Sequence, residues 1–295
     1  DILITAANGS NRLVGKHALI EGIENDTVHG GFMLVARAEK PEFVNAIMSS
    51  SWYSKFINIF VSGGNGAIGN LSKSDLENQK VYVPSEIEQQ KIGSFFKQLD
   101  DTIALHQRKL DLLKEQKKGF LQKMFPKNGA KVPELRFAGF ADDWEERKLG
   151  DISYKVKEKN KTGEFTETLT NSAEYGIINQ RDFFNKDISN AKNLTGYYVV
   201  KNDDFVYNPR ISNFAPVGPI KRNKLGRTGV MSPLYYVFRT HDIDKNYLEK
   251  YFDTVYWHRF MKLNGDSGVR ADRFAIKESV FVEMPIPYPT IEEQE

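Results

Sequence analysis

The sequence contains no cysteine, which excludes disulfide bonds, thiolate zinc sites and cysteine nucleophiles. It also lacks any apolar run close to the roughly 20 residues that a membrane-spanning helix needs, so we expect no membrane partner. The five histidines, at positions 17, 29, 106, 241 and 258, do not have the spacing of metal ligands. The absence of cysteine suits a reducing compartment, and we expect a cytoplasmic location without a bound metal.

Catalytic motifs are equally scarce. No Walker-type phosphate loop is present, so we expect no ATP to be handled by this chain. The run Tyr207-Asn208-Pro209-Arg210 partly resembles the Asn-Pro-Pro-aromatic motif of adenine methyltransferases, but Ile211 stands where an aromatic should stack on the flipped base. No glycine-rich strand–turn–helix precedes this run. We therefore predict a protein that is not an enzyme and binds no cofactor of its own.

What the chain does contain is enough apolar material for two cores. Its 295 residues are 40% hydrophobic and 12% aromatic, which is typical of two folded domains. The net charge is only +2, which is weak evidence for a nucleic-acid ligand. The local charge is more informative, because the segment 204–240 has six Lys and Arg residues against a single acid, Asp204. Basic residues are thus concentrated in one part of the chain.

The sequence also contains an internal repeat. Residues 84–90 resemble residues 289–295 at an offset of 205, and Trp52 aligns with Trp257 at the same offset. A glycine-containing loop follows each tryptophan, at 62–66 and 264–268, and each loop leads to a β-like run that ends in proline, at 80–84 and 285–289. Upstream, the segment that starts at Asp1 matches the one that starts at Asp204. The ordered series of matches predicts two copies of one module.

The second module begins near Trp144, so its residues 144–203 have no counterpart before Asp1. We therefore expect that the front of the first module is missing, and that the chain stops where a second copy of the helix after residue 84 would begin. The second module alternates β-like runs (197–200, 205–207, 234–238, 281–284) with a helical stretch at about 245–263, and the first has a helix at about 41–60. This alternation predicts an α+β fold with mixed or antiparallel sheets.

A long helix should separate the modules. Ser85 and Glu88 have the spacing of a capping box, which Thr290 and Glu293 repeat, and Pro126 and Gly129 end the pattern. We expect one helix from Ser85 to Phe125. Apolar residues recur along it in alternating steps of four and three, interrupted by His106 and Lys117, and form a coiled-coil-type seam: Leu99, Ile103, Leu110, Leu113, Phe120 and Met124.

DNA contacts are predicted in basic and amide-rich loops, because Arg and Asn can bind base edges through two hydrogen bonds and Lys and Arg bind phosphates. Lysines alternate from Lys155 to Lys161 and would share one face of an extended segment, although such a row is more often simply solvated. The full set of candidates is Asn8, Asn11, Arg12, Lys16, Lys73, Lys155, Lys157, Arg181, Arg210, Asn213, Lys221, Arg222, Lys224, Arg227, Arg270 and Arg273.

The middle of the chain resembles a known family. Its residues 84–92, 99–110 and 113–126 look like the central conserved region of the specificity subunit of Type I restriction–modification enzymes. Residues 133–137 and 144–149 look like the entry to that family's second target-recognition domain. The resemblance implies that residues 1–84 are the C-terminal part of a first target-recognition domain, 85–125 the spacer helix, 126–143 a linker, 144–289 the second such domain, and 290–295 the start of a distal conserved helix.

The family resemblance also implies function and partners. Each target-recognition domain would read half of a bipartite site in double-stranded DNA, and the helix would set the spacer and dock methyltransferase (modification) subunits. Motor–nuclease (restriction) subunits would join through them. S-adenosylmethionine, Mg and ATP are then expected on the partner subunits.

Two other interpretations remain open. A coiled-coil adaptor without base readout would use the seam but would not explain Arg and Asn in matching loops of both modules. A methyltransferase with a fused recognition region would need the cofactor loop and the full catalytic motif, which are lacking.

Overall fold

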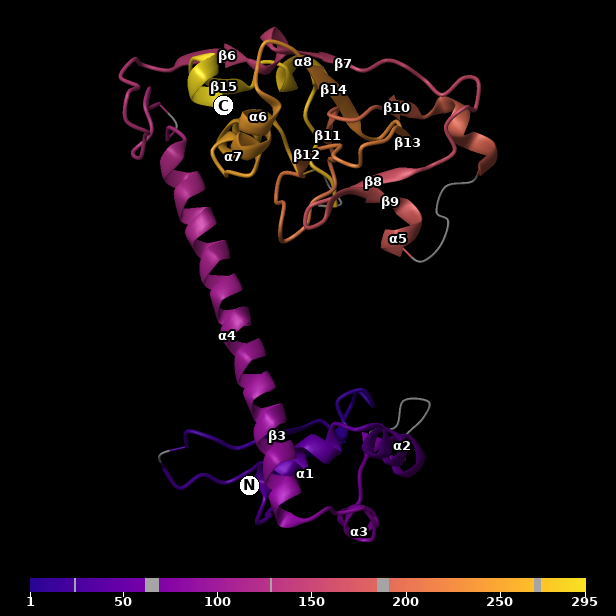
Figure 1. Cartoon of the computed structure of the whole chain (residues 1–295). Coiled ribbons are helices and arrows are strands. Elements are labelled where there is room, and N and C mark those ends of the chain that lie inside the picture. The colour runs from indigo at the N-terminus through magenta and orange to yellow at the C-terminus, as the bar shows by residue number, and fades with distance from the viewer. Residues whose placement is uncertain (24, 62–68, 128, 185–190, 268–271) are drawn as a thin grey trace. The chain divides into compact units, whose positions relative to one another are not determined.

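The computed structural model describes residues 1–23, 25–61, 69–127, 129–184, 191–267 and 272–295 (Figure 1). The chain divides into two compact units, residues 1–113 and 114–295. Helix α4 (Glu86–Met124) begins in the first unit and ends in the second. Sheet-containing regions on both sides of a long helix confirm the predicted α+β fold.

Helix α4 is one continuous helix of 39 residues. Acidic Glu86 and Glu88 in its first turn and basic Lys123 in its last turn complement the helix dipole. Gly93 is its only buried residue, and a Cβ added there would come within 2.7 Å of the backbone nitrogen of Phe43. The absence of a side chain at Gly93 therefore lets the first turns of α4 lie directly against the first unit.

The two predicted capping boxes are not observed. Thr290 precedes helix α9 (Ile291–Gln294) but makes no side-chain cap hydrogen bond. The carboxylate of Glu293 is bound instead by Arg136 and Trp144, which takes it away from the backbone of Thr290. The repeated feature is a different one. Gln89 and Gln294 donate their side-chain amides to the carbonyls of the prolines five residues before them, at 2.8 and 2.9 Å.

In the first unit, strand β1 (Ile2–Thr5) lies between β3 (His17–Leu19) and β4 (Met33–Ala36) in an antiparallel sheet. Alternate residues Ile2 and Ile4 are fully buried, as expected for a strand with one face on a core. Helices α1 (Pro41–Met48) and α2 (Ser51–Phe60) contribute Met48, Tyr53 and Phe56 to this core, and Val14 and Leu71 complete it. A second ladder joins β2 (Ala7–Asn8) to β5 (Gly69–Asn70), and helix α3 (Lys73–Glu77) follows.

The second unit is built on an antiparallel sheet in the order β12-β11-β14-β7. Its strands are β7 (Ser153–Lys155), β11 (Phe205–Tyr207), β12 (Ile220–Arg222) and β14 (Tyr236–Thr240). Helices α6 (Lys245–Phe252), α7 (Trp257–Asn264) and α8 (Glu278–Phe281) pack aromatic side chains against this sheet. Phe125, the residue that follows α4, belongs to the same core.

Smaller ladders complete the second unit. They pair β6 (Glu145–Lys148) with β15 (Pro285–Tyr288), β8 (Leu169–Ser172) with β9 (Gly176–Asn179), and β10 (Tyr198–Val200) with β13 (Gly229–Met231). Helix α5 (Gln180–Phe184) and short 3-10 turns at Leu149–Asp151 and Ala191–Gly196 connect them. Between β13 and β8 a second, smaller core forms around Leu169 and Met231.

The sheets repeat each other in hydrogen-bond register. Ile2 pairs with Leu19, and adding 203 to both numbers gives Phe205 and Arg222, which also pair. On the other edge, Ile2 pairs with Ala36 and Phe205 pairs with Phe238. The first edge thus repeats at an offset of 203, whereas the neighbour on the second edge repeats at an offset of 202, one residue less. The repeated strand order and pairing are the structural counterpart of the repeat in the sequence.

Three expectations about local structure were wrong. The stretches 41–60 and 245–263 each form two helices instead of one, because turns at 49–50 and 253–256 let both helices place an apolar face on the sheet. The run 281–284 is not a strand, since Phe281 ends helix α8 and is buried in the core. The run 80–84 is not a strand either. Its counterpart β15 pairs with β6, and no described strand lies beside 80–84.

Candidate nucleic-acid interface

The predicted basic cluster at 221–224 is neutralised by acidic residues of helix α6 and the turn after it. Lys221 Nζ lies 2.9 Å from a carboxylate oxygen of Asp253. Arg222 lies 2.9 Å from Glu249, and the side chain of Arg222 is only 8% exposed. Lys224 reaches the same Glu249 at 3.2 Å. Each of these three cations therefore has an acidic partner within the fold, and Arg222 and Lys224 share the carboxylate of Glu249.

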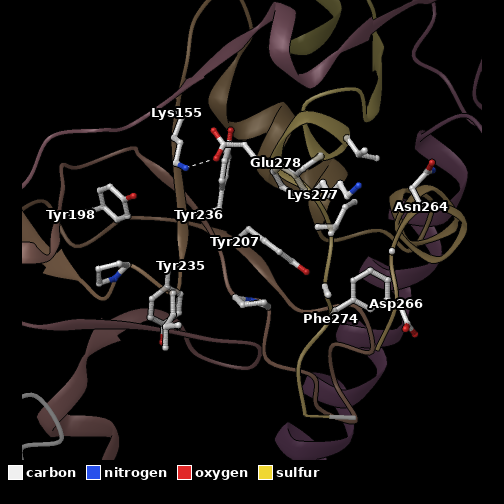
Figure 2. Close-up of a pocket in the computed structure, with 18 residues that line it drawn as sticks. Lys155, Tyr198, Tyr207, Tyr235, Tyr236, Asn264, Asp266, Phe274, Lys277 and Glu278 are labelled. Atoms are coloured by element: carbon white, nitrogen blue, oxygen red, sulfur yellow. Dashed lines mark hydrogen bonds and ion pairs between the residues drawn. The ribbon is translucent and has the colours of Figure 1, made fainter. Parts of the chain in front are cut away.

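Three further candidates are paired with acids. Arg227 donates two hydrogen bonds of 2.8 Å to Glu167, which hold the pKa of Glu167 below its usual range. Lys155 forms an ion pair with Glu278 (Figure 2). In the first unit, Lys73 lies 3.5 Å from a carboxylate oxygen of Glu77 one helical turn away. An exposed pair of this kind contributes little to stability and leaves Lys73 accessible.

Arg210 and Arg273 are brought together by the fold although 63 positions separate them in the sequence. They are direct partners in an antiparallel bridge, flanked by hydrogen bonds from Phe274 N to Pro209 O at 2.7 Å and from Ile211 N to Asp272 O at 3.0 Å. Both arginines are exposed, and among the described residues neither guanidinium has a carboxylate within ion-pair distance. Two positive charges directly opposite each other repel. The bridge is therefore an open, cationic position.

A groove with a volume of about 780 Å³ begins beside this bridge. Pro209 and Phe274, the neighbours of the two arginines, both line it. Figure 2 shows the aromatic side chains of Tyr207 and Tyr236 pointing into the same space. Burial raises the pKa of Tyr236 to about 12, so this phenol stays protonated at neutral pH. The groove combines apolar ring faces with cations at its rim.

The lysine row differs in accessibility. Lys155 lies 5.3 Å from the ring centre of Tyr236 and Lys159 lies 3.1 Å from that of Tyr198, so both are held over aromatic rings. Lys157, between them, is exposed. The ring contacts hold Lys155 and Lys159 against two tyrosines that line the groove, a feature that the charge pattern alone did not predict.

The remaining candidates are distributed over exposed loops. Arg12, Lys16 and Asn213 are exposed, as are Asn11 and Arg181, which also make contacts within the fold. Asn8 accepts a hydrogen bond of 2.9 Å from the backbone of Ser10, which shapes its loop. Arg270 and the glycine loop 62–66 lie outside the described residues, as does Gly268 of the second loop.

Asn208, the residue that partly resembled a methyltransferase motif, has a structural role. Its side-chain amide donates to the carbonyl of Asn171 at 2.8 Å, and its oxygen accepts from the backbone of Arg210 at 3.0 Å. Asn208 thereby fixes the backbone on which Arg210 stands.

The predicted seam on α4 is exposed over most of its length. The side chains of Leu99, Ile103, Leu110, Leu113 and Phe120 are between 43% and 66% exposed, whereas Met124 is half-buried next to the core of the second unit. A stripe of large apolar residues on one helix face is a common site for helix–helix association. Its partner helix stays a prediction.

One structural site was missed in the sequence. Arg136 and Trp144 both bind the carboxylate of Glu293, which is 5% exposed. Trp144 and the second Glu-Glu-Gln motif are both visible in the sequence. Nothing in their spacing links the two, so the sequence does not predict this contact.

Among the described residues, no cluster of His, Asp or Glu has the arrangement of a metal site. The described helices include none that is both long and apolar enough to cross a bilayer.

Comparison with known proteins gives the class of this fold. Residues 37–115 match the family model described as the Type I restriction modification DNA specificity domain. The chain is 26% identical over 240 residues to a putative type I restriction enzyme MjaX specificity subunit of Methanocaldococcus jannaschii, covering 75% of this chain and 52% of that protein. It is 23% identical over 246 residues to the type I restriction enzyme MjaVIII specificity subunit of the same organism, covering 77% and 55%. The chain thus spans about half the length of these relatives.

Solved structures agree on the fold. A chain from a type I restriction–modification system, studied for its complex assembly and conformational transition, superposes with a TM-score of 0.51 at 17% identity, covering 99% of this chain and 71% of that one. The S subunit of the type I system from M. genitalium gives a TM-score of 0.52 at 13% identity, covering 99% and 72%. With the sequence matches, these likenesses confirm the predicted resemblance. The chain is thus similar in sequence and fold to specificity subunits of Type I restriction–modification enzymes.

Proposed function

We propose that this chain recognises DNA as the specificity subunit of a Type I restriction–modification complex, each module reading one half of a bipartite site. The observation that carries this proposal is the repeated strand pairing. The sheets β3-β1-β4 and β12-β11-β14 have the same antiparallel order, the β3-β1 and β12-β11 pairs share one register at an offset of 203, and the 39-residue helix α4 lies between the two sheets in the sequence. Two copies of one module suit a DNA site with two recognised halves. A constant separation between the modules would leave a stretch of constant length between the halves unrecognised.

The cationic bridge and the groove support DNA as the ligand. Arg210 and Arg273 are exposed without an acidic partner among the described residues, whereas Lys221, Arg222 and Lys224 are neutralised. Unpaired cations are available for phosphates and for base edges that accept hydrogen bonds. We place the contact surface of the second module at this bridge and along the adjoining lysine row.

Helix α4 would serve in the assembly of the complex and would have no catalytic role. The exposed apolar stripe on α4 suits a second helix and modification subunits, through which the restriction subunits would join. The methyl transfer and the hydrolysis of ATP would then occur on those partners, which would bind S-adenosylmethionine, Mg and ATP. This chain would supply the positioning of the DNA and perform no catalytic step.

Mapping of methylated adenines tests the proposal. The chain is expressed with its modification subunits in a host without other adenine methylation, and the methylated sites are identified by sequencing of native DNA. We expect one motif with two defined half-sites and a constant undefined spacer. Methylation without a bipartite motif would contradict the proposal. Assembly with partner proteins but no dependence on DNA sequence would favour the second candidate, a coiled-coil adaptor, which the exposed seam alone would also fit.

A further inference from the structure

The loop that follows the central strand is equivalent in the two modules. It runs from Ala7 to Gly15 in the first module and from Arg210 to Gly218 in the second, with the same number of residues. Both loops end in a glycine with a positive φ, of 80° and 82°. Both are anchored alike, since Thr5 N donates to Lys16 O at 2.8 Å and Asn208 N donates to Pro219 O at 2.9 Å.

The segment that pairs with this loop is equivalent as well. Leu71 N donates to Ala6 O at 2.7 Å, and Phe274 N donates to Pro209 O at the same distance. Adding 203 to Leu71 and Ala6 gives these two residues. The next pair outward is Ala7 opposite Asn70 in the first module and Arg210 opposite Arg273 in the second. One backbone geometry therefore presents a methyl group and an amide in one module and two guanidiniums in the other.

The placement of Arg210 opposite Arg273 destabilises the protein when no ligand is bound. Like charges directly opposite each other across an antiparallel pair destabilise it, and among the described residues no acid offsets them. Most of the other cations of the second module predicted to bind DNA have an acid partner, as Lys221 and Arg227 do. An uncompensated pair of guanidiniums at an exposed position is suited to a ligand with hydrogen-bond acceptors.

The difference between the modules separates base reading from phosphate binding. Every B-DNA half-site presents the same phosphates, so a phosphate clamp should have the same chemistry in both modules. Base edges differ between half-sites. Arginine forms two hydrogen bonds with the O6 and N7 of guanine, and asparagine forms two with adenine. A position that keeps its backbone and changes its side chains is therefore suited to reading sequence.

We propose that this cross-strand position sets the difference in base preference between the two modules. Arg210 and Arg273 contact guanine edges in the second half-site, and Asn70 contacts a different base, adenine, in the first. The inference rests on the proposed function and deepens it, because it names the residues that make the two half-sites unlike.

Transplanting the pair tests this inference. The double variant Arg210→Ala with Arg273→Asn gives the second module the side chains of the first, and it is assembled with the modification subunits for mapping of methylated adenines. We expect the second half-site to lose its guanine preference at one or two adjacent base pairs. The first half-site and the spacer should stay unchanged. The reciprocal variant, Ala7→Arg with Asn70→Arg, should change only the first half-site.

The salt dependence of binding separates the two kinds of contact. Loss of base contacts should leave the slope of log affinity against log salt concentration unchanged, whereas loss of a phosphate contact lowers the slope by about one. An unaltered motif, or uniform weakening at all sites with a lower slope, would overturn the inference. If the variant methylates nothing, sequences bound from a random duplex pool are read instead, and an unaltered motif there overturns it too.

Two controls keep the outcomes distinct. Thermal unfolding of the variant should match that of the parent protein or occur at a higher temperature, since a repulsion has been removed. If the unmodified chain gives no bipartite motif at all, the proposed function fails. If it gives one and the transplanted pair leaves that motif unchanged, only this inference fails.

Discussion

Arg136 and Glu293 are 157 positions apart in the chain and form an ion pair with two contact points. Arg136 Nε and Nη2 lie 2.7 and 2.8 Å from the two carboxylate oxygens of Glu293. Trp144 Nε1 donates a third hydrogen bond to this carboxylate at 3.0 Å. Glu293 of helix α9 thereby binds Arg136 of the linker and Trp144, the residue before strand β6. These contacts join the beginning of the second module to its end.

Removing this carboxylate should destabilise the second unit. Glu293→Ala leaves a largely buried arginine without a counter-charge and a tryptophan N–H without an acceptor, which costs about 3 kcal/mol. Denaturant unfolding followed by tryptophan fluorescence measures the change. Glu88 occupies the corresponding position in the first module and is exposed, so Glu88→Ala is the matched control, with an expected cost below about 0.5 kcal/mol. Equal costs for the two variants would show that the contacts of Glu293 contribute nothing.

The neutralised basic cluster should act on stability and not on DNA binding. Arg222 is nearly buried and pairs with Glu249, so Arg222→Ala should lower the free energy of unfolding by about 2 kcal/mol. The salt dependence of DNA binding should remain unchanged, because Arg222 has no free charge to offer a phosphate. Arg210→Ala should instead weaken binding in the assembled complex without a loss of stability and, as loss of a base contact, without a change in the salt slope. A reduced salt slope for Arg222→Ala would assign it to the DNA surface after all.

The loop from Arg210 to Gly218 should not accept a side chain at its last residue, Gly218. Its φ is 82°, and an added Cβ would lie 2.1 Å from the carbonyl oxygen of Asn208. Gly218→Ala should therefore cost about 3 kcal/mol or more, as both backbone strain and a steric clash arise. Gly163 has a φ of 71° and open space around it, so Gly163→Ala isolates the strain and should cost only about 1 kcal/mol. Thermal unfolding of the two variants gives the comparison, and similar melting temperatures would rule out the clash.

Acid should destabilise the second unit through His258. Burial, with a smaller effect of Lys262, lowers the pKa of His258 to about 4. Because the unfolded chain binds a proton near pH 6.5 and the folded chain does not, stability falls as the pH drops from 6.5 toward 4. The expected loss is on the order of 1 kcal/mol by pH 5, allowing for the partial exposure of the ring. His258→Gln should remove this component of the pH dependence between pH 7 and 5; an unchanged slope would assign it to other groups.

The exposed seam should drive association of the isolated chain. Leu110 and Leu113 are about half exposed, and Ile103 is two-thirds exposed, so burying them against a second helix is favourable. Light scattering should show a dimer or larger species that increases with concentration. Ile103→Glu with Leu110→Glu should give a monomer, whereas Lys109→Glu, at the position preceding Leu110 and off the seam, should not. A monodisperse monomer of the unmodified chain would count against the seam.

Local signals were sufficient for the long helix and the repeat. The helical run ends at Pro126, and its apolar spacing is visible without any tertiary contact, so α4 was predicted to within one residue at each end. The strand after the second glycine loop, β15, was visible in the same way, whereas its predicted counterpart at 80–84 does not form. The helix break at 253–256 was not, because it is imposed by the sheet that both helices cover.

The candidate site shows the limit of sequence patterns most clearly. The clustering of charge predicts DNA contacts at 221–227. The acids that pair with these cations lie 25 to 60 positions away in the sequence and are Asp253, Glu249 and Glu167. The pairing of Arg210 with Arg273 depends on two chain segments meeting in one ladder. Neither relationship has a sequence signal.

The sequence by itself therefore determined two related α+β modules, one long helix and the resemblance to a known family. These features depend on periodicity and on order along the chain, which are local. Only the tertiary structure decided which cations are free, which are bound within the fold, and that the two modules present different side chains on one repeated backbone. Electrostatic balance depends on distance in space, and the fold alone sets that distance.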